Sequence, residues 1–537
     1  MVTDDYLMPI NTMMAAYYGR RAQDYMEEGT CAQVNVQTVT MERDGECQCD
    51  KTTCSYDEAV ELTGHGKYNY LLLLACCVIM NAVSMDMFGF SVIVTTSSCD
   101  LQLSLTEIGV LASTPFAGVV LAYPWGYYAD TRGRKKALIL SSSVGFVFAV
   151  MTSLATSWQF MFVAKFLASS FSSAGFTLTV TLLGECTGQK HRSQFLFILN
   201  SVNLAAELVY FGLAYVILPL DFAIATPLAS LTLRSWRLLT FILALPLGFG
   251  ALMMVILYES PKFLANRGDI PQALEVLKKM YERNGGVKGC YKVRNILTGD
   301  DMVSTKLSFW DSLVKQTLPI FRPPLLWKTL QLFYLLALLC SANNVFIVLF
   351  PTIVNEFFST LDNGWTDKTF CERLFTGNNY EPTHTNYVCD DKVSNNTIYS
   401  GMAYGLFFWV LTLVISTFAR RRKLVLMGTL ALAGISCCLV NLKEPISNLV
   451  FFILLQSTCV GIGSIFSYFV DMYPTSYRGL ATGLALMFAR QVSFVGVNII
   501  TAVITHNCSL TFYSWAVFIF SGIFVGWFLP ADTRAPK

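Results

Sequence analysis

Long apolar runs alternate with short polar segments along the chain. Each run holds roughly 20 residues, enough to cross a bilayer as a helix. Gly, Pro, Ser and Asn occur inside several runs, which is common where membrane helices pack against one another. The pattern predicts an all-α integral membrane protein with twelve transmembrane helices, at residues near 69–93, 107–128, 137–156, 160–184, 195–218, 238–258, 329–353, 399–419, 424–441, 447–470, 479–503 and 511–529.

The charges of the connecting segments predict the orientation. Lys and Arg are frequent after the second run, in 260–328 and in Arg420–Lys423, and they are absent from 94–105 and 157–160. Because Lys and Arg favour cytoplasmic loops, and because the number of helices is even, we expect both termini in the cytoplasm. Residues 1–62 are polar and acidic, so they predict a cytoplasmic tail and not a cleaved signal.

Composition narrows the class of protein. Only 14% of the 537 residues are charged, against about a quarter in soluble proteins, and the formal net charge of +2 predicts no nucleic-acid partner. The spacing of Cys47, Cys49 and Cys54 fits no zinc template, so no metal is expected. The four His residues all lie in predicted loops and no phosphate-binding loop occurs, so we expect neither an enzyme nor a cofactor.

Local patterns recur on the two sides of the segment 260–328. An acid precedes an Arg by seven positions both in Glu185–Arg192 and in Asp471–Arg478, at matching places after the fourth and tenth helices. The turns that open the third and ninth helices also match. A duplicated six-helix unit is typical of carriers whose halves rock around a central cavity. We therefore predict the tail 1–62, a first bundle 63–259, a linker 260–328, and a second bundle 329–537 with a lumenal loop 354–398.

The linker is predicted to contain short amphipathic helices beneath the bundle. Ser260 can cap a helix that has Pro261 at its first position. An apolar stripe follows, at Leu264, Ala273, Leu274, Val276 and Leu277.

Charges bunch at the predicted cytoplasmic helix ends. Gly133 permits a tight turn, and Asp130 is expected near the positive start of the eleventh helix. The second half has Thr417 in place of Asp130, so the halves are not equivalent. We interpret the charges as a gate of ion pairs that breaks when the cavity opens inward, the alternative being that they only set topology. The gate comprises Gly126, Asp130, Gly133, Arg134, Lys135, Glu185, Arg192, Glu259, Asp471 and Arg478.

Ionisable residues inside predicted membrane helices point to function, because such residues are costly in lipid. At ~1.5 Å per residue, Asp86 of the first helix and Lys165 of the fourth lie roughly 8 Å and 10 Å from the midplane. We expect them to pair, either as a site of proton coupling or as a permanent structural ion pair. Glu207 and Arg490 fall near the midplane of the corresponding fifth and eleventh helices.

The midplane residues are candidates for binding a substrate. Arg490 favours an anionic group such as a carboxylate, which a guanidinium can bind through two hydrogen bonds. The alternative is that Glu207 and Arg490 are each tied to a neighbouring helix. The substrate-binding candidates are Glu207, Arg490, Asn203, Asn344 and Gln491.

Residues of the loop 354–398 are candidates for a disulfide and for glycosylation. Cys371 and Cys389 face an oxidising compartment, where they are candidates for a disulfide. Asn395-Asn-Thr397 is a glycosylation sequon on the same side of the membrane.

These motifs resemble the major facilitator superfamily. The stretch Gly126–Lys135 is similar to its signature loop, and Glu259–Lys262 and Pro530–Arg534 resemble its sugar-porter and organic-ion branch. Over residues 55–535 the chain resembles synaptic vesicle glycoprotein 2 and its relatives, through Ser55-Tyr-Asp-Glu-Ala59, Gly64-His-Gly-Lys-Tyr68, Ser235-Trp-Arg237 and Tyr258-Glu-Ser-Pro-Lys262.

The resemblance implies roles for two of the membrane charges. An acid on the first helix opposite a base on the fourth serves proton coupling in sugar porters, and Arg490 resembles a cationic position of the organic-anion branch. Two features depart from the family. The large lumenal domain is reduced to 354–398, and Val83 stands where a second acid would accompany Asp86.

We interpret the chain as a secondary transporter that moves a small organic solute, an organic ion or a sugar, by alternating access. Whether protons drive it stays open. The expected partners are the substrate and the lipid bilayer, with a monomeric protein in the plasma membrane or an intracellular vesicle membrane. The alternative is a glycoprotein of the same fold that transports nothing and serves as a binding scaffold.

Overall fold

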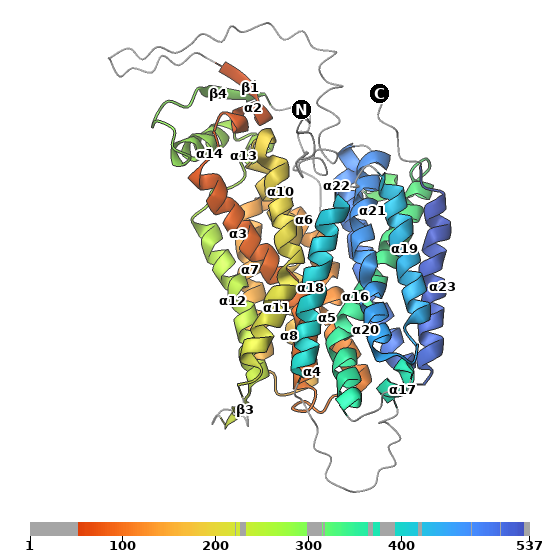
Figure 1. The fold of residues 1–537 in the computed structure, drawn as a ribbon. Helices are drawn as coiled ribbons and strands as arrows, with labels where there is room; N and C mark the ends of the chain where they lie inside the picture. Colours follow the sequence, from red (N-terminus) through yellow and green to blue (C-terminus); the bar gives the residue numbers. More distant parts are fainter. Residues whose placement is uncertain are drawn as a thin grey trace, which may run out of the picture.

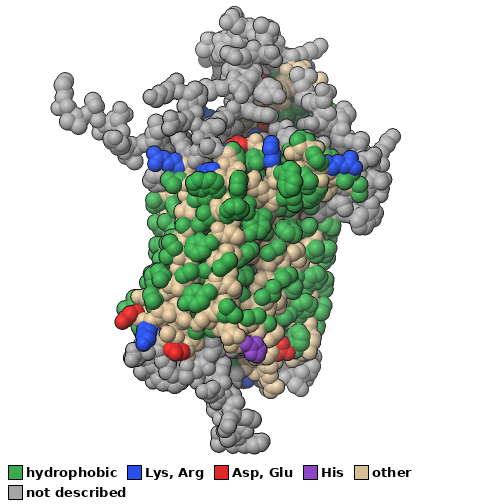
Figure 2. Space-filling model, turned by 90° about the vertical axis from the view of Figure 1, so that its right-hand side faces the viewer, with side chains coloured by type: hydrophobic (Ala, Val, Ile, Leu, Met, Phe, Trp, Pro, Cys, Tyr) green, Lys and Arg blue, Asp and Glu red, His purple; other side chains and the backbone are tan. Residues whose placement is uncertain are grey.

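The computed structural model describes residues 52–220, 222–225, 232–297, 314, 317–362, 369–375, 393–416, 421–473, 475–504 and 506–530. Long helices lie side by side in two groups, with the first half of the chain on the left of Figure 1 and the second half on the right. Apolar side chains cover the middle of the face in Figure 2, while charged side chains gather toward its two ends. This distribution matches a protein surrounded by lipid along its length.

The first half is built from helices that are often interrupted. Its elements are α3 (Lys67–Ser84), the π-helix η2 (Met85–Gly89), α4 (Phe90–Ser97), α5 (Leu105–Gly118), the 3₁₀-helix η3 (Val119–Leu121), α6 (Ala122–Arg132), α7 (Arg134–Ser153), α8 (Trp158–Ser172), α9 (Ala174–Glu185), α10 (Gln189–Leu204), α11 (Ala206–Ile217) and α12 (Ser235–Val255). The short strands β2 (Ile224–Ala225) and β3 (Thr232–Leu233) pair antiparallel before α12.

The second half is built from longer helices. Its elements are η4 (Leu318–Phe321), α16 (Leu326–Asp362), α17 (Phe370–Phe375), α18 (Asn395–Ser416), α19 (Arg422–Leu439), α20 (Pro445–Leu454), η7 (Leu455–Ser457), α21 (Thr458–Met472), α22 (Thr475–Val503) and α23 (Cys508–Trp527).

Within the described residues, eleven helices are long and apolar enough to cross a membrane. The count rises to twelve if the bent pair Leu105–Leu121 and Pro124–Arg132 is one span, with an angle of 42° between its parts. The prediction of an all-α membrane protein with twelve helices is confirmed on that count.

A small subdomain covers one end of the first half. It contains β1 (Thr52–Ser55), α2 (Tyr56–Glu61), α13 (Pro261–Asn266), α14 (Ile270–Arg283) and β4 (Val293–Leu297), at the upper left of Figure 1. Strands β1 and β4 pair in parallel. Ser260 accepts a hydrogen bond from the Phe263 N–H with Pro261 at the helix start, so the predicted cap is confirmed. We call this end of the bundle, where Arg134–Lys136 and Arg421–Lys423 lie, the basic end.

The two halves contact each other mainly away from the basic end. Asn498 Nδ2 donates to Ser113 Oγ at 3.1 Å, Thr95 and Thr352 are joined through their hydroxyls at 2.8 Å, and Tyr399 donates to Tyr215 at 3.2 Å. These bonds join α22 to α5, α16 to α4, and α18 to α11. All ion pairs between described residues lie within one half or its attached subdomain.

The disulfide prediction is wrong in its partner. Cys371 of α17 is bonded to Cys508 at the start of α23, 137 residues later, and not to Cys389, which lies outside the described residues. The reason is that α17 packs against the end of the second bundle, where the backbone N–H of Cys371 donates to Asn441. Sequence proximity within the loop was therefore a poor guide to proximity in space.

Replacing Cys508 should free one specific thiol. In Cys508→Ser, Cys371 loses its partner, so its modification by a maleimide in the denatured protein without reductant should rise from almost none to nearly complete. Peptide mass mapping of the labelled protein measures this. Cys437→Ser, which removes a buried free cysteine, is the control. Labelling of Cys371 in the parent protein, or a linked Cys371–Cys389 peptide, would contradict the assignment.

Candidate functional site

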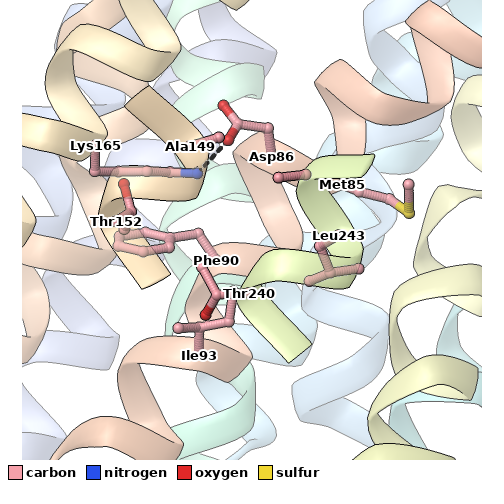
Figure 3. Close-up of a pocket in the computed structure, with 10 residues that line it drawn as sticks. Met85, Asp86, Phe90, Ile93, Ala149, Thr152, Lys165, Thr240 and Leu243 are labelled. Atoms are coloured by element: carbon pink, nitrogen blue, oxygen red, sulfur yellow. Dashed lines mark hydrogen bonds and ion pairs between the residues drawn. The ribbon is translucent and has the colours of Figure 1, made fainter. Parts of the chain in front are cut away.

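The residues Asp86 and Lys165 form a buried ion pair between the first and fourth membrane helices. Lys165 Nζ lies 2.5 Å from Asp86 Oδ1, and the exposed fractions of the two side chains are 5% and 10% respectively. Figure 3 shows the two side chains reaching toward each other from their helices. Ser169 and Ser172 donate to the second oxygen, Oδ2, at 3.3 Å and 3.1 Å. Both carboxylate oxygens are thus hydrogen-bonded, as a buried charge requires.

The surroundings of the pair are apolar with a few hydroxyl groups. Lys165 Nζ lies 4.3 Å from the centre of the Phe90 ring, a cation–π distance that adds to the stabilisation of the ammonium. Thr152 and Thr240 line a cavity of about 20 Å³ beside the pair, drawn in Figure 3. Such a cavity has room for about one water molecule and excludes an organic solute. The space beside the pair can therefore hold a water molecule, but it is too small for the solute.

Helix interruptions accompany the membrane charges. Asp86 lies in the π-helix η2, which separates α3 from α4. The fourth helix breaks between α8 and α9 at Ser173, next to Ser172, which donates a hydrogen bond to Asp86. The fifth helix breaks between α10 and α11, just before Glu207. Interrupted helices of this kind supply unpaired backbone groups and local freedom to move at functional sites. The hydrophobic pattern gives no sign of these breaks.

Arg490 lies where α22 of the second half meets the first half. Its guanidinium donates to Met87 Sδ at 2.9 Å and stands 5.5 Å from the ring centres of Phe88 and Phe116. None of the carboxylates in the described part of the chain pairs with it. Met87 and Phe88 follow Asp86 directly in η2, so one short turn contacts both the ion pair and Arg490.

Glu207 lies at the other junction of the halves, between α11 and α18. Its side chain fills the space beside Gly405, where an added Cβ would come within 3.0 Å of Glu207 Cβ. Tyr210, Tyr404 and Cys459 are close enough to interact with its charge. Among the described residues, no Lys or Arg forms an ion pair with Glu207.

The amide candidates are used to join helices. Asn203 accepts from Ser84 within the first half, and Asn344 donates to Ser493 at 3.0 Å within the second. Gln491 crosses the junction, where its Nε2 donates to Phe116 O at 3.0 Å. Arg490 and Gln491 thus lie together at one junction, while Glu207 lies at another.

Among the described side chains, the predicted gate residues form separate clusters within each half, and a latch across the halves stays a prediction. Arg134 binds Asp130 at 3.2 Å and Glu185 at 3.3 Å, and Ser260 donates to Glu185. Asp130 is 67% exposed and pairs with Arg134, one helical turn away. Its expected contact with the start of the eleventh helix stays a prediction, because the side chains there lie outside the described residues. In the second half, Asp471 pairs with Arg422. The side chain of Arg478 lies outside the described residues.

Glu259 caps the start of α7. Its carboxylate accepts from the N–H groups of Lys135 at 2.9 Å and Lys136 at 3.4 Å. Two features require glycine at position 133. Its φ of 113° is a backbone conformation that few other residues adopt, and an added Cβ would come within 2.3 Å of Glu259 Oε2. An added Cβ on Gly126 would meet nothing within 4 Å, so tight packing does not explain that glycine.

Sequence reasoning missed two clusters. Asp100 accepts from Trp236 Nε1 at 3.2 Å and Arg237 Nη2 at 3.1 Å, and Arg237 also donates to Ala155 O at 2.5 Å. These bonds tie the loops after α4 and α7 to the start of α12, at the end opposite the basic end. Arg192, expected in the gate, pairs at 2.8 Å with Asp57, before the first membrane helix.

Asn395 begins α18 and is exposed, so its glycosylation stays a prediction.

Comparison with known sequences gives a consistent picture. A family model described as Major Facilitator Superfamily matches residues 74–366. Synaptic vesicle glycoprotein 2C of Mus musculus is 25% identical over 239 residues, which are 44% of this chain and 32% of that protein. Synaptic vesicle glycoprotein 2B of Homo sapiens is 24% identical over 255 residues, 46% and 37% of the two chains. The chain spans about a third of the length of the curated relatives it matches.

Solved structures share the fold. The xylose transporter XylE from E. coli, in a partially occluded inward open conformation, has a TM-score of 0.61 at 12% identity, with 88% of this chain and 100% of that chain covered. At this identity the likeness speaks for the fold alone.

Removing both members of the buried ion pair should destabilise the protein less than the sum of the two single removals. Lys165→Met leaves a buried carboxylate and should lower the free energy of unfolding by about 3 kcal/mol, whereas Asp86→Asn combined with Lys165→Met should cost less than the sum of the single changes. Denaturant titration in detergent measures this cycle. Lys279→Met, which breaks the exposed pair with Glu275, should change little. Additive effects at positions 86 and 165 would contradict a direct pair.

Proposed function

Because the chain belongs to the major facilitator superfamily, we propose that it is a secondary transporter that moves a small organic solute by alternating access. In this proposal the halves, residues 63–259 and 329–537, rock about the substrate, and the linker 260–328 joins them. The observation that carries the proposal is the ion pair of Asp86 and Lys165, buried in an apolar bundle beside the junction of the halves. A membrane protein with a purely structural task has no need of such a costly group.

The chemistry of the pair supports a role in proton coupling. A proton on Asp86 would neutralise its carboxylate and remove the charge partner of Lys165 Nζ. Ser169 and Ser172 could keep hydrogen bonds to the neutral acid, because hydroxyl groups both donate and accept. The cavity beside the pair, with space for about one water, offers a place for a proton donor. Proton binding would thus change the interactions between the first and fourth helices without unfolding the site.

The π-helix η2 offers a route from the proton to the substrate. Asp86 contacts the fourth helix, while Met87 and Phe88 contact Arg490 of the second half. A movement of η2 on protonation of Asp86 would therefore shift the contacts that hold Arg490. This arrangement supports a coupled cycle in which the proton and the substrate bias the same junction.

Arg490 supports an anionic group on the substrate. Its guanidinium touches a sulfur atom and two aromatic rings, and within the described residues it has no carboxylate partner. A carboxylate could replace the weak contact with Met87 Sδ, while the rings of Phe88 and Phe116 could stack on an apolar or cyclic body. A neutral sugar is the competing class of substrate, in line with the xylose named for the solved relative.

The remaining parts of the proposal concern location. The Lys and Arg residues of the basic end support a cytoplasmic orientation for that end and for both termini. The relatives named as synaptic vesicle glycoproteins support a vesicle membrane, with the plasma membrane as the other choice. The scaffold alternative is not favoured, because it gives no reason to retain Asp86, Lys165 and Arg490 in the membrane.

Uptake into proteoliposomes tests transport and coupling together. With a pool of labelled organic anions, sugars and organic cations, an inward proton gradient should raise uptake of one class, and Asp86→Asn should remove that response. Ser170→Ala, at a neighbouring buried hydroxyl that bonds to Phe166 O and not to Asp86, is the matched control. Uptake that ignores the gradient in both proteins would reduce the pair to a structural role. No uptake by folded, inserted protein would favour the scaffold.

Arg490 should determine the selectivity for charge. Loss of a charge-assisted hydrogen bond of about 1.5–3 kcal/mol in Arg490→Gln should raise the KM for a carboxylate substrate roughly 10- to 100-fold, with little effect on neutral solutes. Arg490→Lys should retain part of the anion affinity. Concentration series of uptake give these KM values. An equal loss for anions and neutral sugars would assign Arg490 to packing between the halves.

A further inference from the structure

A short segment before the first membrane helix is attached to the basic end by many specific contacts. We call residues 52–66 the clasp. Its strand β1 pairs in parallel with β4 of the linker, and Ser55 caps α2 together with Glu58 in a capping box. Ala59 and Val60 are almost fully buried. Figure 1 shows β1 and α2 beside β4, α13 and α14.

The linker holds the far side of the clasp. Tyr291 donates to Ala59 O at 2.6 Å. Asn284 Nδ2 donates to the carbonyls of Thr63 and Gly64, both at 3.2 Å. Asn284, the residue directly after α14, therefore satisfies backbone carbonyl groups just before α3 begins.

The clasp also holds two of the predicted gate residues. Tyr56 Oη donates to the backbone carbonyl of Glu185 at 2.7 Å, and Asp57 pairs with Arg192 at 2.8 Å. Burial raises the pKa of Tyr56 well above its ordinary range, as expected for a hydroxyl that the docked clasp holds away from water. While the clasp is docked, Arg192 is bound within the first half and is not available to a carboxylate of the second half.

Two histidines meet where the clasp reaches α10. The rings of His65 and His191 stack with their centres 4.1 Å apart and their planes 21° apart, and Phe195 and Tyr70 pack on His65 at 5.1 Å and 4.9 Å. Burial lowers the pKa of His65, the charge of His191 lowers it further, and Glu61 acts in the opposite direction. Two stacked imidazoles cannot both be protonated without repulsion.

The sign of the pH dependence follows from this shift. The docked clasp favours neutral His65, whereas the released clasp exposes an imidazole with an ordinary pKa near ~6.5. The released state thus binds more protons as the pH falls, so docking is strongest above ~6.5 and weakens below it. Tyr70, Glu61 and His191 are the titratable groups shown to face His65, and Glu61 opposes the effect only in part.

We propose that residues 52–66 are a pH-sensitive clasp in which Asp57 and Tyr56 position the gate residues Arg192 and Glu185. A fall in pH at the basic end releases the clasp through protonation of His65 and His191. Release frees Arg192 to bind carboxylates of the second half and so favours closure of the basic end. The consequence for gating rests on the proposed transport function, whereas the clasp and its release do not.

Cys54 of β1 offers a native probe of the clasp. Its thiol is partly buried, and burial followed by the charge of Glu58 raises its pKa. Both effects slow reaction with a maleimide while the clasp is docked. In the full-length protein, the substitutions C31S, C47S, C49S and C290S would remove four other cysteines predicted at the basic end, and peptide mass mapping would separate the label on Cys54 from label on the cysteines that remain. Dividing its labelling rate by that of a peptide of residues 52–66 at the same pH removes the intrinsic titration of the thiol.

The expected result is a labelling ratio that rises as the pH falls. From pH 7.5 to 5.5 the ratio should increase about three- to tenfold, and the double change His65→Gln with His191→Gln should flatten this profile. At pH 7.5, Asp57→Asn should raise the ratio about two- to fivefold, and Asp57→Glu should restore part of the protection. Tyr56→Phe, which keeps the ring and removes the hydroxyl, should also raise it. Glu275→Gln, on the exposed face of α14, should leave it unchanged.

The outcomes separate the clasp from the transport proposal. A ratio that is flat with pH and insensitive to Asp57→Asn and Tyr56→Phe overturns the clasp, whatever uptake shows. A ratio that responds as described supports the clasp even if no solute enters proteoliposomes, in which case the transport proposal alone fails. If the clasp responds but Asp57→Asn leaves the pH profile of uptake unchanged, the positioning role in gating is overturned.

Discussion

The cost of placing charge inside an apolar bundle is the constraint on which this structure depends. An unpaired ammonium or carboxylate in such surroundings is far too unfavourable to persist, so Asp86 and Lys165 must lie in contact and their remaining hydrogen-bonding groups must find partners. Ser169, Ser172 and the ring of Phe90 supply them. The same requirement brings the first and fourth helices together at one depth. It also explains why serines cluster on α8, within a helix that is otherwise apolar.

The interruption of the first membrane helix at η2 links the ion pair to the contact between the halves. Because η2 carries Asp86 on one side and Met87 and Phe88 on the other, it joins the ion pair to the contact between the halves at Arg490. The halves are hydrogen-bonded mainly away from the basic end, through pairs such as Ser113 with Asn498. At the basic end, the ion pairs between described residues stay within each half. Such a division of contacts suits two rigid halves that separate at one end and meet at the other.

Much of the fold could be predicted from the sequence, because it depends on local properties. Run lengths determine the spans, and the rise per residue places Asp86 and Lys165 at a common depth. Features that depend on helix rotation or distant contacts could not be predicted. Hydropathy does not register a π-turn at Met85, the partner of Cys371 lies 137 residues away, and Asp57 gives no sequence signal that it will bind Arg192. The gate stays a prediction, since Arg134 satisfies Asp130 one turn away while the side chains at the start of the eleventh helix lie outside the described residues.

The central claim, that transport is coupled to protons through Asp86, can be tested by counting protons. Changes in external pH that accompany solute uptake would be recorded for proteoliposomes of the parent protein, of Asp86→Asn, and of a protein locked by a disulfide between S113C and N498C, which replace side chains whose Oγ and Nδ2 atoms lie 3.1 Å apart. The account predicts that protons enter together with the solute in the parent protein, and that they do not enter in Asp86→Asn or in the locked protein. Solute uptake without proton movement in the parent protein, or unchanged proton movement in Asp86→Asn, would contradict it.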